Sequence, residues 1–127
     1  MSHLTITATS RSYPEKLPYE AIKDAILGKR YELSLAFVGA TRAAQFNETY
    51  RQKTYVPNVL SFPLTDTAGE IIICPVVARK EAHKFDLTPD GYMAFLFIHG
   101  CLHLKGLDHG DTMDKQERKY LNAFNIS

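Results

Sequence analysis

The sequence predicts an α+β fold with α/β character, in which a small four-stranded mixed sheet carries helices on its faces. Runs of strand length alternate with helical patterns along the chain, which favours parallel strands joined by helical crossovers. The connection from Pro63 to Gly69 is the exception, because it is too short for a helix and makes its flanking strands antiparallel. We therefore expect three parallel strands and one antiparallel edge strand. No linker divides the 127 residues, so we expect a single domain over 1–127.

The first half of the chain is expected to hold two strands and two helices. Leu4–Ala8 alternates Thr and Ile like a short strand. A helix over residues 18–28 has proline in its first turn and glycine at its end. Tyr31–Val38 alternates at first and is then apolar enough for a central strand. Thr41 is the expected N-cap of a helix that runs to about Tyr50.

The antiparallel pair comes next. Val59–Phe62 and Glu70–Cys74 are its predicted strands, and Pro57 and Pro63 at the ends of the first favour an edge position, since proline cannot donate to a neighbouring strand.

Three helices are predicted in the remainder. The first covers Val76–Phe85. The second starts after Thr88, the expected N-cap, with Pro89 in the first helical position. The third runs from about Asp111 or Thr112 to Phe124.

Composition narrows the class of protein. No apolar run approaches the roughly 18 residues that cross a membrane, and the first residues lack the pattern of a secretory signal. Two cysteines cannot form a disulfide framework, which favours a cytoplasmic location. The net charge of +1 lacks the basic excess of most nucleic-acid binders. Any nucleic-acid contact must therefore be local. The candidates are Arg42, Arg51 and Lys53, interleaved with Tyr50 and Tyr55, and a second group of Arg79, Lys80 and Lys84 that solvated helix faces explain at least as well.

Three of the five histidines fall between positions 99 and 109. His99 and His103 are spaced to share one face of a helix, and Gly106 suits the turn that would bring His109 back to them. Three imidazoles leave the fourth position of a tetrahedral zinc ion open, as in catalytic sites. The spacing matches the zinc-protease pattern H-E-x-x-H-x-x-G-x-x-H, except that Gly100 replaces the glutamate that acts as general base.

The block H-G-C-L-H-L-K-G-L-D-H resembles the hallmark of the YbeY-type endoribonucleases of ribosomal RNA maturation. The segments N-E-T-Y-R at 47–51, N-V-L-S-F-P at 58–63 and G-E-I-I-I-C at 69–74 are similar to further blocks of that family. The resemblance implies the same fold, with residues 1–127 as a single metal-dependent hydrolase domain. It also implies a zinc-dependent, single-strand-selective endoribonuclease that acts in 16S rRNA 3′ end processing and ribosome quality control. Single-stranded RNA, ribosomal RNA or the small ribosomal subunit would be its partner, with no membrane and no DNA.

These considerations lead to a specific site hypothesis. His99, His103 and His109 would bind one Zn²⁺ per chain, and Asp108 would orient a histidine ligand. Arg51 would clamp the phosphate as the catalytic residue, because a guanidinium can hold two phosphate oxygens.

Three more residues, Lys53, Asn58 and Ser61, are weaker candidates for contacts with the RNA chain. Two alternatives stay open. One is a zinc peptidase-like hydrolase, which lacks a base at Gly100, and the other is a non-catalytic ribosome assembly factor with structural zinc.

Overall fold

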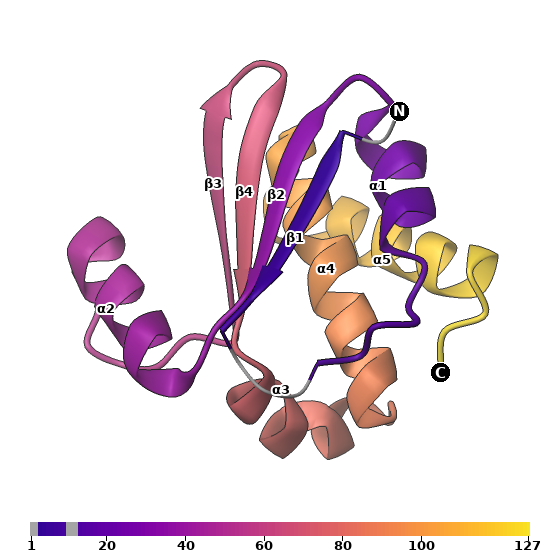
Figure 1. Ribbon diagram of the computed structural model, residues 1–127. Coiled ribbons are helices and arrows are strands. Elements are labelled where there is room, and N and C mark those ends of the chain that lie inside the picture. The colour runs from indigo at the N-terminus through magenta and orange to yellow at the C-terminus, as the bar shows by residue number, and fades with distance from the viewer. Residues whose placement is uncertain (1–2, 10–12) are drawn as a thin grey trace.

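A twisted four-stranded sheet lies at the centre of the computed structural model, which describes residues 3–9 and 13–127 (Figure 1). Its strands are β1 (Leu4–Ala8), β2 (Glu32–Phe37), β3 (Val59–Thr65) and β4 (Ala68–Ile73). Their order is β1-β2-β4-β3, with β1, β2 and β4 parallel and β3 antiparallel to β4. The predicted sheet, including the antiparallel edge strand, is confirmed.

Strand β3 is longer than the sequence predicts. It continues past Pro63 to Thr65, with an irregularity in its pairing between those two residues. Pro63 is exposed on the free edge, where a missing N–H removes no bond to a neighbouring strand. The prediction that Pro63 ends the strand was therefore wrong, although the edge position that the proline indicated is correct.

The helices differ from expectation mainly at their ends. They are α1 (Tyr19–Leu27), α2 (Ala40–Arg51), α3 (Pro75–Glu81), the 3-10 turn η1 (Ala82–Phe85), α4 (Pro89–Lys105) and α5 (Asp111–Ala123). Gly39, not Thr41, occupies the N-cap of α2, so Thr41 lies inside its first turn. The single helix predicted up to Phe85 is divided into α3 and η1, and Asp86 ends it in a left-handed conformation at φ 57°.

Helix α4 starts and stops where its sequence predicts. The Thr88 hydroxyl accepts the Gly91 N–H at 3.0 Å, and Pro89 fills the first helical position. At the other end Gly106 has φ 111°, a left-handed conformation that favours glycine, and its N–H caps the helix. These two ends determine where the histidines of the last turns emerge.

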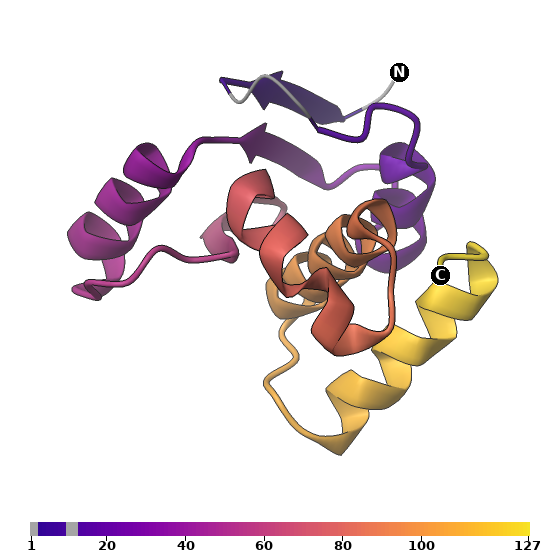
Figure 2. The same cartoon turned by 90° about the horizontal axis from the view of Figure 1, so that it is seen from below.

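Alternate residues of the sheet build two separate cores. Ile71 and Ile73 face a large cluster with α1, α4 and α5, whereas Ile72 faces a smaller cluster with Ala43 of α2. Helix α4 is thus enclosed by the sheet on one side and by α1, α3 and α5 on others, and α2 stands apart (Figure 2). Enclosure explains why α4 is apolar nearly all round. Within residues 3–9 and 13–127, no helix is long and apolar enough to span a bilayer.

Candidate metal centre and cleft

The C-terminal turns of α4 present two histidines on one face. His99 and His103 are four residues apart, so their side chains project side by side. Their Nε2 atoms are 3.0 Å apart and their ring centroids 4.5 Å apart. Two imidazole nitrogens this close either share a proton or are arranged to bind one ion.

The turn after Gly106 returns the chain to this pair and delivers His109. Its ring centroid lies 5.0 Å from that of His99 and 4.8 Å from that of His103. One nitrogen from each of the three histidines lies within 4.8 Å of the others. The structure therefore brings together the three histidines that the sequence singles out, in a group that could hold a metal ion.

The donor set fits a metal ion because its hydrogen bonds turn free nitrogens toward the group. The Nδ1 of His99 lies 2.6 Å from Oε2 of Glu117, so Nδ1 carries the proton and Nε2 keeps a lone pair that a metal ion can accept. The imidazole of His103 is also held by a hydrogen bond to the backbone of Leu107. Two ligands on a tetrahedral zinc are roughly 3.3 Å apart, given Zn–N bonds of about 2.0–2.1 Å. The 3.0 Å between the Nε2 atoms of His99 and His103 is close to this value, and the His109 nitrogen lies within 4.8 Å of both.

The pKa of the His103 imidazole also favours metal binding. Burial lowers this pKa below its ordinary value, and repulsion from His99 and His109 lowers it further. The bond to Leu107 and the charge of Asp108 act in the opposite direction. His103 therefore keeps a lone pair for a metal at neutral pH.

Glu117 is the site residue that sequence reasoning missed. It lies on α5 in a charged segment that reads as a solvent-exposed helix face, yet it is only 7% exposed. Met113, Glu117 and Tyr120 are the buried residues of α5, at the spacing of one helical face. A carboxylate within an otherwise apolar stripe was the signal that could have identified it. Asp108, predicted for this orienting role, is exposed, and its role stays a prediction.

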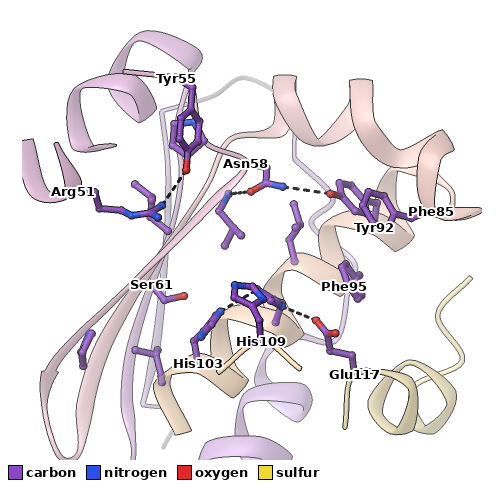
Figure 3. Close-up of a pocket in the computed structure, with 17 residues that line it drawn as sticks. Arg51, Tyr55, Asn58, Ser61, Phe85, Tyr92, Phe95, His103, His109 and Glu117 are labelled. Atoms are coloured by element: carbon purple, nitrogen blue, oxygen red, sulfur yellow. Dashed lines mark hydrogen bonds and ion pairs between the residues drawn. The ribbon is translucent and has the colours of Figure 1, made fainter. Parts of the chain in front are cut away.

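The histidine group forms one end of an open cleft of about 690 Å³ (Figure 3). Helix α4 makes one wall, and β3 with the end of α2 makes the other. Arg51 projects into the cleft from that second wall, and its Nη1 donates to the Tyr55 hydroxyl at 3.4 Å. An exposed guanidinium thus shares one cleft with the histidines, although the two come from distant parts of the sequence.

The weaker candidates have different positions. Ser61 lines the cleft, and its hydroxyl donates to the Gly100 carbonyl at 3.4 Å. Asn58 also lines it, but its amide NH₂ donates to Glu81 at 3.0 Å and its carbonyl accepts the Val59 N–H at 2.7 Å. Lys53 is exposed on the loop after α2, outside the residues that line the cleft.

Gly100 marks the closest approach of α4 to the sheet. A Cβ at this position would lie 2.9 Å from Ile71 Cδ1 and 3.0 Å from Ser61 Oγ. The position that carries the general base in zinc proteases is therefore pressed against β3 and β4. A glutamate here would have to displace the side chains of Ile71 and Ser61.

Comparisons with known proteins point to one family. A family model described as Endoribonuclease YbeY matches residues 4–125. Relatives named Endoribonuclease YbeY from Polynucleobacter asymbioticus and Stutzerimonas stutzeri are 41% and 38% identical over 95 and 98 residues. Those matches cover 72% and 71% of this chain and 61% of each relative. A relative of the same name from Neisseria meningitidis is 36% identical over 111 residues, covering 75% of this chain and 66% of its own length.

A solved structure supports the fold independently. The solution structure of TM1509 from Thermotoga maritima superimposes with a TM-score of 0.67 at 26% identity. The match covers 94% of this chain and 87% of that one. The chain spans less than two thirds of the length of the curated relatives it matches. With the family model matching nearly its whole length, the chain belongs to the Endoribonuclease YbeY family.

Proposed function

We propose that this chain is a zinc-dependent, single-strand-selective endoribonuclease that acts in ribosomal RNA maturation, at the 3′ end of 16S rRNA, and in ribosome quality control in the cytoplasm. The observation that carries the proposal is the shared cleft. A three-histidine group and an arginine face the same cavity, one suited to a metal and the other to a phosphate. The family description and the names of the relatives support RNA as the substrate.

His99, His103 and His109 are the proposed metal ligands. An all-imidazole set suits zinc among the common metals, and three protein ligands are typical of catalytic rather than structural zinc. When bound, zinc would supply a Lewis acid for a phosphate oxygen and lower the pKa of a bound water. Glu117 holds the His99 ring in the required tautomer, through a contact whose partners are both largely buried.

Arg51 is the proposed phosphate clamp. A guanidinium has five N–H donors, and the bond to the Tyr55 hydroxyl uses only one nitrogen. The remaining donors can fork onto two phosphate oxygens. Because Tyr55 fixes one edge of the guanidinium, the side chain loses less freedom on binding than an untethered surface arginine would.

Proteolysis is disfavoured by the packing at Gly100. The zinc-protease base would have to occupy a space already filled by Ile71 and Ser61. An assembly factor without catalysis remains the alternative that experiment must separate from a nuclease, since both would bind RNA through this cleft.

A three-substrate assay tests the proposal. Zinc-loaded protein is incubated with an unstructured RNA, the same sequence as a duplex, and casein, each with and without a chelator. We expect chelator-sensitive cleavage of the unstructured RNA alone. Cleavage of casein that disappears in His103→Ala would favour a peptidase. Tight RNA binding without cleavage would favour the assembly factor.

A further inference from the structure

One wall of the cleft is aromatic, and the proposed mechanism does not use it. Phe85 of η1 and Tyr92 and Phe95 of α4 line it together. Their rings are nearly parallel: Phe85 and Tyr92 are 4.8 Å apart at 18°, and Tyr92 and Phe95 are 5.9 Å apart at 17°. The Phe95 ring lies 6.3 Å from that of His99. The aromatic wall thus begins beside the histidine group and leads away from it (Figure 3).

The three rings differ in what they can offer a ligand. Tyr92 is 2% exposed, and its hydroxyl donates to Glu81 at 3.2 Å while accepting from Asn58 at 3.3 Å. It belongs to the framework of the fold. Phe85 is 50% exposed although it is large and apolar, and Phe95 is half-buried with its ring 6.0 Å from that of Phe85. These two phenylalanines leave aromatic surface open to the cleft.

The arrangement fits a flat, uncharged ring carried by an anionic chain. Arg51 and Tyr55 lie on the opposite wall, so a phosphate held there leaves the attached base facing the aromatic side (Figure 3). Aromatic side chains stack on any nucleobase because every base has a π face. The Asn58 amide beside the wall is engaged at both ends by the fold, so it is not presented to the edge of a base.

We propose that Phe85 and Phe95 form a stacking subsite for one unpaired base, next to the linkage held at the histidine group. The proposal rests on the proposed function for the identity of the chain that enters the cleft. The subsite detects the presence of an unpaired base and not its identity. A base within a duplex is paired and stacked on its neighbours, so it cannot also lie on this wall. The wall therefore provides a physical basis for selecting single strands.

The chain has no tryptophan, which allows a direct optical test. Phe85→Trp keeps an aromatic platform and introduces a unique fluorophore. The zinc-loaded variant is titrated with a short unstructured 2′-O-methyl RNA, checked for intactness after the titration, and with the same oligomer lacking its central bases. We expect quenching by the intact oligomer and little by the abasic one. Leu64→Trp is the matched control, because Leu64 is 63% exposed but lies outside the cleft lining.

Binding affinity gives the second readout. Phe85→Ala and Phe85→Leu should weaken binding of the intact oligomer by about 5- to 150-fold, the range for loss of one stacked base. Both variants should also lose most of the preference for intact over abasic oligomer. Leu64→Ala should bind like the wild type. Melting temperature and zinc content show whether each variant is folded.

The outcomes separate this inference from the proposed function. Base-dependent quenching without cleavage of unmodified RNA would support the subsite and remove the nuclease. The subsite would be overturned, and the nuclease left intact, if the wild type cleaves RNA while Phe85→Ala binds the oligomer as tightly as the wild type does and abasic positions do not weaken binding. Failure of the wild type to bind any RNA would overturn the subsite as well.

Discussion

Replacing Glu117 tests how the metal centre is held. Its Oε2 lies 2.6 Å from His99 Nδ1, and the two side chains are 9% and 16% exposed. Removing a carboxylate that orients a metal-binding histidine typically weakens metal affinity by about 10- to 100-fold. Each tenfold loss corresponds to about 1.4 kcal/mol, so Glu117→Ala should lose about 1.4–2.8 kcal/mol of zinc-induced stabilisation. For a chain of this size the zinc-dependent rise in Tm should shrink by roughly 4–14 °C.

The assay is thermal unfolding of wild type, Glu117→Ala and Glu117→Gln over a series of free zinc concentrations. Glutamine should recover part of the affinity, because its amide oxygen still accepts the His99 N–H but lacks the charge. Glu48→Gln is the control, since Glu48 is exposed on α2 away from the site. Equal zinc-induced shifts in the wild type and Glu117→Ala would refute the orienting role.

Three further predictions concern the same site. Chelator-free protein should contain one zinc per chain by elemental analysis, and the His99→Ala, His103→Ala double variant should contain almost none; equal contents would remove the histidines as ligands. Because the pKa of His103 is lowered from 6.5 in the folded protein, this histidine binds a proton more readily in the unfolded chain than in the folded one. The metal-free protein should therefore lose stability as the pH falls from 6.5 toward the folded pKa, and His103→Asn should reduce this slope in denaturant titrations; parallel curves would contradict it. Gly100→Glu should cost about 3 kcal/mol or more, because its side chain overlaps those of Ile71 and Ser61 and buries a charge, and it should confer no proteolysis; a variant as stable as wild type would show that these side chains move aside easily.

Much of the fold follows from local sequence signals. Thr88, Pro89 and Gly106 define the ends of α4 through capping chemistry that needs no tertiary information. The short connection after Pro63 predicts the antiparallel pair for a similarly local reason. The spacing of the histidines in α4, with the turn at Gly106, predicts the group of imidazoles that the structure shows.

The residues that escaped prediction depend on packing between elements. Glu117 becomes part of the site only because α5 packs against the face of α4 that carries His99. Phe85 reaches the cleft because the predicted helix ends in a 3-10 turn that redirects the chain. Helix α2 starts two residues earlier than the capping signal at Thr41 indicates, so that Gly39 is its N-cap. Short-range patterns do not contain this information.

The most direct test of the account is single-turnover cleavage of a short unstructured RNA by zinc-loaded wild type, Arg51→Lys and Arg51→Ala, with bound zinc and Tm measured for each. Arg51 is exposed and cannot bind zinc, so its removal should leave both quantities nearly unchanged. We expect cleavage by Arg51→Ala to be about 10²–10³ slower, the usual effect of losing one preorganised charge contact, and Arg51→Lys to recover only part. Equal rates in all three proteins, or a wild type that binds RNA without cleaving it, would contradict the claim that the arginine and the histidine group form one RNA-cleaving centre.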